Sequence, residues 1–202
     1  SGRLLRRMDD DRQGLRSNRV LSLAVDGAHL WVGTGEGLHR LTLETWQARH
    51  IPVGSAQADL PVNRYIAGLS AGQGQVHVGT LEGVSSGAAD AARLDLLLPV
   101  AHGHGRGIGG VHDDGAGGLW VGVRDGDILH RDGGGRVRRF GVQYGLHPQT
   151  ELHGGKMVRS ADGTVFIAAS SGVVMLEPGL LKQPVPALPN LQPQVISLHL
   201  DG

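Results

Sequence analysis

His102 and His104 are the residues of this sequence that most resemble metal ligands, because they stand two positions apart in one short run. A pair of imidazoles could bind zinc or copper, but no carboxylate or further histidine lies close in sequence to complete the coordination. Glycines and Arg106 surround the pair, which is typical of a polar loop. We therefore predict a connecting loop here and no metal site.

An acidic, glycine-rich run begins at Asp113 and Asp114. It could be compared with a calcium-binding loop, but the bidentate glutamate that completes an EF-hand ligand set is missing. Its position between two apolar segments instead favours a type I turn with a bulge. The neighbouring run Gly105–Gly110 has the composition of a phosphate-binding loop without the strand and helix that such a loop requires. The sequence therefore predicts no cofactor.

Two Asn-Arg pairs, Asn18–Arg19 and Asn63–Arg64, stand 45 residues apart, and Arg106 takes a similar place farther along. Each pair precedes a predicted strand. A ring of such residues suits carboxylates or sugar hydroxyls, because a guanidinium group binds an oxyanion through two parallel hydrogen bonds. The alternative is structural: the asparagines cap the turns that lead into the strands, and the arginines are solvated.

The pairs belong to an internal repeat whose copies align on one bulky anchor residue. The steps between anchors are 46, 43 and 46 residues, and each anchor is followed by a β-branched residue and then by a small one. The anchors are Trp31, His77, Trp120 and Phe166. The sixth residue after each anchor is a glycine: Gly37, Gly83, Gly126 and Gly172. Another glycine precedes each anchor, at Gly27, Gly74, Gly117 and Gly163. Repetition at this period indicates an array of equivalent structural units.

One unit consists of four predicted short strands joined by turns. In the first unit we expect strands at Val20–Val25, Leu30–Thr34, Leu38–Leu43 and Ala48–Val53. Four antiparallel strands in about 45 residues describe one blade of a β-propeller. Val84–Gly87 is a poor match to the third strand of the second unit. A helical solenoid is excluded, because glycines would interrupt every candidate helix.

The repeated positions have separate predicted roles in such a blade. The anchors, Trp31 and Trp120 above all, should lie in the core between blades. The small residue that follows an anchor should let a neighbouring sheet approach closely. The glycine at the sixth position should adopt a positive φ in a turn.

The composition narrows the classes of function. Of the 202 residues, 34 are glycine and none is cysteine, so a disulfide scaffold and a thiolate metal site are excluded. The 19 basic and 19 acidic residues balance, which argues against a nucleic-acid partner. No apolar stretch of the sequence is long enough to span a bilayer.

These motifs resemble the two-component regulator propeller repeats of bacterial membrane sensors. The matching segments are Gly14–Val20 with Leu30–Leu38, and Asp114–Gly122. The second copy departs from the family pattern, because His77 stands in the place of tryptophan. The resemblance implies an all-β fold, a partial β-propeller of about four four-stranded blades cut from a larger ring.

The repeat and the resemblance together divide the chain. We assign residues 1–13 to the tail of a preceding blade, residues 14–58, 59–104, 105–143 and 144–182 to four blades, and residues 183–202 to a linker and the first strand of an immunoglobulin-like β-sandwich. A ring cut in this way leaves two blade faces bare. If a face buries on the order of 400 Å² of apolar surface, roughly 10 kcal/mol of stabilisation is missing. We therefore expect missing N-terminal blades, or self-association that covers the open faces.

The resemblance implies a ligand-sensing module on the periplasmic side of the inner membrane, in a receptor whose cytoplasmic half is a histidine kinase or a diguanylate cyclase. The chain itself would be non-catalytic and would reach the membrane only through a downstream segment. Its expected partners are a small-molecule or oligosaccharide ligand and a second receptor chain. Two alternatives stay open: a protein-interaction propeller, and a propeller polysaccharide-degrading enzyme. The enzyme is less favoured, because no paired carboxylates recur at the channel positions.

Overall fold

The computed structural model describes residues 8, 14–55, 63–100, 107–147 and 150–184, without the side chains of residues 153–156. Most of the predicted blade tail at 1–13 and all of the predicted sandwich strand lie outside the described residues. His102, His104 and Arg106 also lie outside them.

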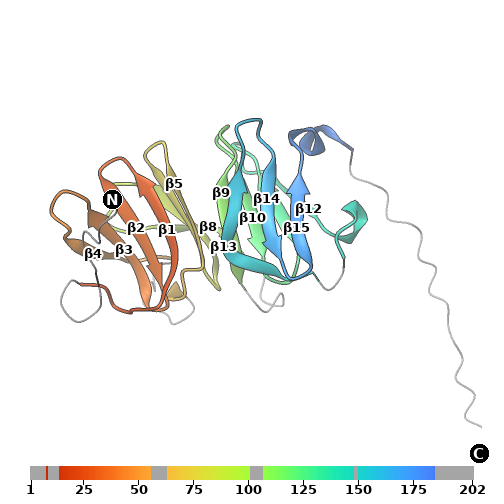
Figure 1. Ribbon diagram of the computed structural model, residues 1–202. Coiled ribbons are helices and arrows are strands. Elements are labelled where there is room, and N and C mark those ends of the chain that lie inside the picture. The colour runs from red at the N-terminus through yellow and green to blue at the C-terminus, as the bar shows by residue number, and fades with distance from the viewer. Residues whose placement is uncertain (1–7, 9–13, 56–62, 101–106, 148–149, 185–202) are drawn as a thin grey trace, which may run out of the picture.

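The described chain forms four small antiparallel sheets, each built from strands consecutive in sequence (Figure 1). Blade 1 contains β1 (Val20–Asp26), β2 (His29–Thr34), β3 (Gly37–Thr42) and β4 (Ala48–Ile51). Blade 2 contains β5 (Gly68–Gly72), β6 (Gln75–Gly79), β7 (Gly83–Ala88) and β8 (Asp95–Pro99). Blade 3 contains β9 (Ile108–Asp113), β10 (Leu119–Val123), β11 (Ile128–Arg131) and β12 (Val137–Phe140). Blade 4 contains β13 (Leu152–Arg159), β14 (Val165–Ala169) and β15 (Gly172–Leu176).

The blades follow one another around a common axis as a β-propeller, which confirms the predicted fold class. The innermost strands β1, β5, β9 and β13 lie side by side in this order. A 3₁₀ turn, η2 (Val142–Tyr144), follows blade 3, and a second, η3 (Pro178–Lys182), follows β15. The four strands predicted for the first unit are present as β1 to β4. The interpretation of Val84–Gly87 as a poor strand is wrong: β7 pairs with both β6 and β8, and the Ser86 hydroxyl shares a hydrogen bond with His77 of β6.

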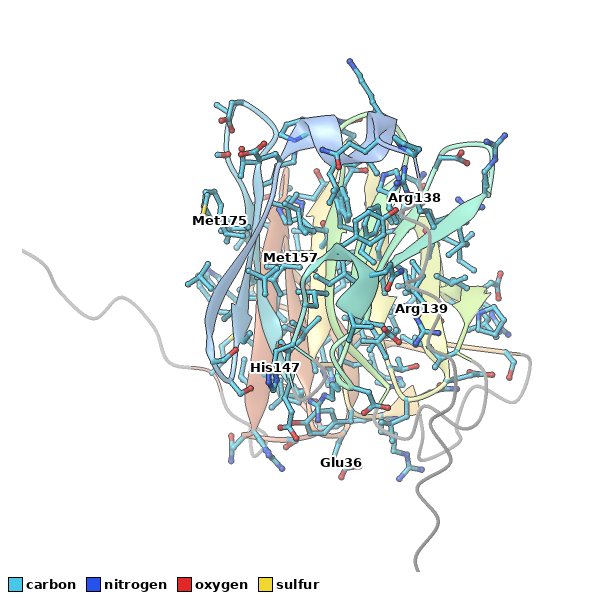
Figure 2. All side chains as sticks on the ribbon, turned by 90° about the vertical axis from the view of Figure 1, so that its right-hand side faces the viewer. Glu36, Arg138, Arg139, His147, Met157 and Met175 are labelled. Carbon is cyan, nitrogen blue, oxygen red and sulfur yellow. The ribbon has the colours of Figure 1, made fainter. Side chains whose placement is uncertain are left out.

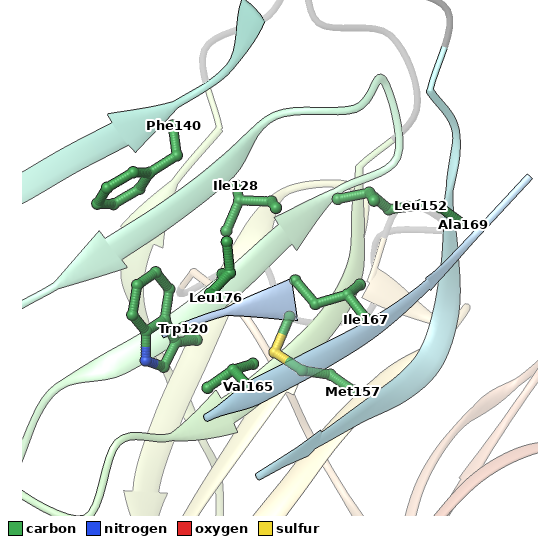
Figure 3. Packing of buried hydrophobic residues seen from close by; sticks show 9 residues of the cluster. All are labelled: Trp120, Ile128, Phe140, Leu152, Met157, Val165, Ile167, Ala169 and Leu176. Atoms are coloured by element: carbon green, nitrogen blue, oxygen red, sulfur yellow. The ribbon is translucent and has the colours of Figure 1, made fainter. Parts of the chain in front are cut away.

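Hydrophobic clusters between consecutive blades hold the fold together. Trp31, Leu38 and Ile51 of blade 1 pack against Val76 and Val78 of blade 2. A second cluster joins blades 2 and 3. The third joins blades 3 and 4, as Figure 3 shows. Its buried members are Trp120, Ile128, Phe140, Leu152, Met157, Val165, Ile167, Ala169 and Leu176.

Each repeat anchor lies on the face of its blade that looks toward the next blade. Trp31 and Trp120 are buried there, so their predicted place in the core between blades is confirmed. His77 is partly buried and shares a hydrogen bond with the Ser86 hydroxyl through Nδ1, at 2.8 Å. The polar pair His77–Ser86 thus replaces the indole in the second copy. Phe166 is also partly exposed, because it lies on the face of blade 4 opposite the cluster shared with blade 3.

The small residue after the anchor is required by the spacing of the blades. A Cβ on Gly33 would lie 2.7 Å from the Ile66 carbonyl oxygen and 2.2 Å from Ser22 Oγ. A Cβ on Gly79 would lie 2.4 Å from Ile108 Cγ2 in the next blade. Both distances are far below van der Waals contact, so the predicted close approach is confirmed at these two positions. The predicted turn conformation is confirmed too, since the sixth-position glycines all have positive φ.

The outer faces of blades 1 and 4 remain largely uncovered. Among the described residues no hydrophobic cluster contains members of both blades, although β1 and β13 touch at the axis. Leu23 and Val25 of β1 are each 60% exposed. On blade 4, Val173 and Met175 of β15 are 68% and 60% exposed. Figure 2 shows Met175 at the surface on this side. The two ends of the array therefore present apolar side chains that inner blades would bury.

Gly33→Ala tests the close approach of the blades. The new methyl group would clash with backbone as well as side-chain atoms, so we expect the free energy of unfolding to fall by about 1–3 kcal/mol. Gly72→Ala is the matched control, because nothing lies within 4 Å of its Cβ position. Urea unfolding followed by tryptophan fluorescence measures both variants. Equal stabilities of the two would contradict the packing argument.

Candidate functional site

Side chains from three segments converge at the end of the propeller where the innermost strands begin. Arg19 stands directly before β1, Tyr65 shortly before β5, and Arg124 directly after β10. The Arg19 guanidinium carbon lies 5.4 Å from the centroid of the Tyr65 ring, and that of Arg124 lies 5.0 Å from it. Both distances are within the range of cation–π attraction. One tyrosine thus holds two cations from two different blades.

Arg64 and Glu36 extend this cluster at the same end. Glu36 stands in the turn between β2 and β3. One of its carboxylate oxygens lies 3.7 Å from the Arg64 guanidinium. The two side chains are 45% and 55% exposed, so the ion pair contributes little to stability. Figure 2 places Glu36 at one end of the molecule, far from Arg138. The mouth cluster, as we call Arg19, Glu36, Arg64, Tyr65 and Arg124, combines three arginines, one carboxylate and one aromatic ring.

The two predicted asparagines have different environments. Asn63 is buried, and its Oδ1 accepts a hydrogen bond from the Thr80 hydroxyl at 3.3 Å. Its Nδ2 is buried without a hydrogen-bond partner among the described residues. Asn18 is exposed, and its backbone carbonyl accepts a hydrogen bond from the Val20 amide. The structure therefore brings Arg19 and Arg64 to the mouth as a pair of exposed cations, and places the Asn63 side chain inside the protein.

Sequence reasoning missed Tyr65, Arg124 and Glu36. Tyr65 follows Arg64 directly and is one of 2 tyrosines in the chain, so its rarity was an available signal. Arg124 is the fourth residue after the anchor Trp120, and the equivalent residue of the first copy is Gly35. Nothing in the repeat pattern indicates that this turn position would meet Tyr65, because the meeting depends on how blades 2 and 3 are placed around the axis.

The acidic run beginning at Asp113 connects β9 to β10 as a turn, as predicted. The Asp114 carboxylate accepts hydrogen bonds from the Ala116 and Gly118 amides, each at 2.8 Å, and pairs with His130 Nε2 at 2.8 Å. Burial opposes ionisation of Asp114, but these hydrogen bonds hold its pKa below the usual value. Both carboxylate oxygens of Asp114 are therefore engaged by groups of the protein itself, namely two amides of the turn and His130. In the described part of the chain no group of three or more His, Asp or Glu side chains is arranged to hold a metal ion.

His39 of β3 is a buried histidine with a shifted pKa. Its side chain is fully buried, and its Nε2 accepts a hydrogen bond from the Arg16 amide at 3.1 Å. Burial, and after it the neighbouring His50 and Arg16, lower the pKa of His39 from 6.5 to about 4. The ring is therefore neutral at physiological pH and acts as a hydrogen-bond acceptor that fixes the segment leading into β1.

Comparison with known proteins gives matches at the level of the fold. No family model and no curated protein matches the sequence. The extracellular domain of the putative hybrid two component system BT4673 from B. thetaiotaomicron has a TM-score of 0.63 and 15% identity, over 83% of this chain and 22% of that one. The corresponding domain of BT3049 from the same organism gives 0.58 and 18%, over 84% and 22%. The chain shares its fold with extracellular domains of two-component systems.

The same fold is also found in an enzyme. An ancestral GH74 enzyme matches with a TM-score of 0.56 and 14% identity, over 78% of this chain and 22% of that one. The chain thus spans about a fifth of the length of each of these three proteins. The described residues include no helix that is long and apolar enough to cross a membrane. At such identities the likeness defines the architecture, and the function must be argued from the site.

The low pKa of His39 predicts a pH-dependent stability. The unfolded chain takes up a proton near pH 6.5, whereas folded His39 does so only near pH 4, so acid favours unfolding between these values. We expect this group to contribute stability that is complete above pH 6.5 and falls by up to about 3 kcal/mol as the pH decreases to 4. Urea unfolding across this range, compared with His39→Gln, measures the effect. A His39 ring that titrates near pH 6.5 by NMR would contradict the prediction.

Proposed function

We propose that this chain is an extracytoplasmic ligand-sensing propeller module of a bacterial transmembrane signalling receptor, of the sensor-kinase or diguanylate-cyclase type. The observation that carries the proposal is the convergence of Arg19 and Arg124 on Tyr65 at one mouth of the propeller. The fold shared with extracellular domains of two-component systems supports the receptor context and a periplasmic location.

The mouth cluster suits a small anionic oligosaccharide. Arginine forks bind carboxylates bidentately, and the Tyr65 ring holds two of these forks next to each other. The cluster draws on separate segments, so a ligand that bridges Arg19 and Arg124 would connect blade 1 to blade 3. Such a ligand would favour one arrangement of the blades over others, which is the physical basis of sensing.

The module is proposed to be non-catalytic. Hydrolysis of a glycosidic bond ordinarily uses two carboxyl groups placed on either side of the bond. In the mouth cluster the single carboxylate, Glu36, is paired with Arg64. Recognition by cations fits this composition better than acid–base chemistry. A protein-interaction propeller remains the alternative, and binding of a polypeptide instead of a saccharide at the mouth cluster would favour it.

The ligand proposal is tested by calorimetric titration with an acidic oligosaccharide, tetragalacturonic acid. We expect the wild-type chain to bind it and the double variant Arg19→Ala/Arg124→Ala to lose roughly tenfold or more in affinity, as expected for the loss of charge-assisted hydrogen bonds. Arg49→Ala, an exposed arginine on the outermost strand β4, is the control and should leave the affinity unchanged. Equal losses in both variants, or no binding by the wild type, would refute the proposal.

We also propose that a second copy of the chain covers the open blade faces. The outward face of blade 4 carries the anchor Phe166 with Val173 and Met175, the kind of face that meets a following blade inside the array. The outward face of blade 1 carries Leu23 and Val25, on the side that meets a preceding blade. The two faces are thus of opposite kinds, and two copies arranged about a twofold axis could satisfy both at once.

Sedimentation velocity over a range of concentrations tests this association. We expect the wild-type chain to form a dimer and Leu23→Ser/Val25→Ser to shift it toward the monomer, because the substitutions remove apolar contact area. Leu81→Ser is the control, since Leu81 is exposed but stands in the turn between β6 and β7. A wild-type chain that stays monomeric at every concentration would overturn the proposal.

A further inference from the structure

Glu36 supplies the single carboxylate of the mouth cluster, and this carboxylate is not needed to hold the turn in which it stands. The Thr34 hydroxyl donates a hydrogen bond to the Gly37 carbonyl at 2.9 Å and accepts one from the Glu36 amide at 3.1 Å. The Gly35 amide donates to the Arg19 carbonyl at 3.0 Å. Backbone groups and one hydroxyl thus fix the turn, and the Glu36 carboxylate can serve another purpose.

The equivalent glutamate of the next blade shows the contrast. Glu82 also stands five residues after its anchor, and its amide likewise donates to a threonine hydroxyl, that of Thr80, at 3.1 Å. Its carboxylate accepts a hydrogen bond from the Ser55 backbone amide at 3.3 Å. The Glu36 carboxylate is paired instead with the guanidinium of Arg64. The same repeat position therefore carries a structural carboxylate in blade 2 and a carboxylate beside a cationic site in blade 1.

The ion pair between Glu36 and Arg64 is loose enough to be exchanged. Its charged atoms are 3.7 Å apart, which is longer than a hydrogen bond, and its side chains are 45% and 55% exposed. Figure 2 shows Glu36 at the surface of this end of the molecule. Such a pair contributes little to stability, so its replacement by another ion pair costs little. A ligand carboxylate that forms two parallel hydrogen bonds to the guanidinium can therefore compete with Glu36.

The ion pair also lies beside the arginines that contact the Tyr65 ring. Arg64 directly precedes Tyr65 in the sequence. A Cβ on Gly35, the residue before Glu36, would lie 3.6 Å from Arg19 Cδ, so the stem of Arg19 runs over the turn that carries Glu36. A ligand bound at Arg19 therefore has Arg64 and its counter-ion next to it.

We propose that Glu36 is an exchangeable counter-ion of Arg64 that sets the charge selectivity of the mouth cluster. A ligand with two anionic groups is bound by Arg19 and Arg124 alone. A longer polyanion also displaces Glu36 from Arg64 and gains a third cation, against the competition of the Glu36 carboxylate. The mouth cluster thus distinguishes acidic saccharides by their number of carboxylates. The inference rests on the proposed function, because it concerns how the same site recognises its ligand.

Calorimetric titration with digalacturonic acid and with tetragalacturonic acid tests the inference. We expect Glu36→Gln to bind the tetrasaccharide at least about threefold more tightly than the wild type does, because the competing charge is removed. The affinity for the disaccharide should stay unchanged, and added salt should reduce the gain for the tetrasaccharide. Glu44→Gln is the matched control: it removes the same charge from an exposed position in the turn between β3 and β4, and it should change neither affinity.

Arg64→Gln separates the counter-ion role from other effects of Glu36. We expect this variant to bind the tetrasaccharide more weakly and the disaccharide as the wild type does. In the Arg64→Gln background, Glu36→Gln should have no further effect, because the two residues act as a pair. Urea unfolding compares the stabilities of the variants, and the ratio of the two affinities is a readout that a purely structural role would not change. If Glu36→Gln is unstable, the effect of Arg64→Gln on this ratio decides.

The outcomes separate this inference from the proposed function. Binding of the tetrasaccharide by the wild type and by Glu36→Gln with equal affinity at low salt would overturn the role of Glu36 and leave the proposed function in place. Equal gains for the disaccharide and the tetrasaccharide would also overturn it. Binding by Glu36→Gln without binding by the wild type would support the counter-ion role and refute the proposed function. No binding by either chain would refute both.

Discussion

The fold depends on the distance at which two sheets can pack face to face. Each blade places a bulky anchor on one face and a glycine or alanine beside it, so that the next blade fits around the anchor. Trp31 is completely buried by this arrangement, while the missing Cβ of Gly33 leaves room for the Ile66 backbone. Neither residue works alone, since a large side chain at position 33 would force the blades apart and expose the indole. The same residue pattern recurs along the chain because each pair of neighbouring blades must pack at the same short distance.

The anchors also give the array a direction, and this accounts for its two unlike ends. Every anchor looks toward the following blade, so Phe166 looks toward a place that no described blade fills. The residues on the opposite faces look toward the preceding blade, and in blade 1 they include the exposed Leu23 and Val25. The exposed apolar surface therefore follows from the geometry of the repeat. It is where a partner surface gains the most from the hydrophobic effect.

Strand polarity places the mouth cluster. Innermost strands that all run in the same direction begin at the same end of the axis, and the turns between the second and third strands lie at that end too. Arg19 and Tyr65 come from strand entries, whereas Arg124 and Glu36 come from such turns. Loops at one end of a rigid scaffold can thus vary in sequence while the scaffold keeps them close together. This is a common way for a propeller to carry a binding function.

The sequence by itself determined the repeat, the order and type of the strands, the turn glycines and the burial of Trp31 and Trp120, because each of these depends on local steric rules that recur at a fixed period. It also indicated Arg19 and Arg64 as residues near one mouth. Only the tertiary structure decided that Tyr65 and Arg124 join Arg19, that Asn63 is buried against Thr80, and that Val84–Gly87 forms a strand paired on both sides. These outcomes depend on contacts between segments tens of residues apart, and the distance between such segments is set by the packing of whole blades, which no local pattern records.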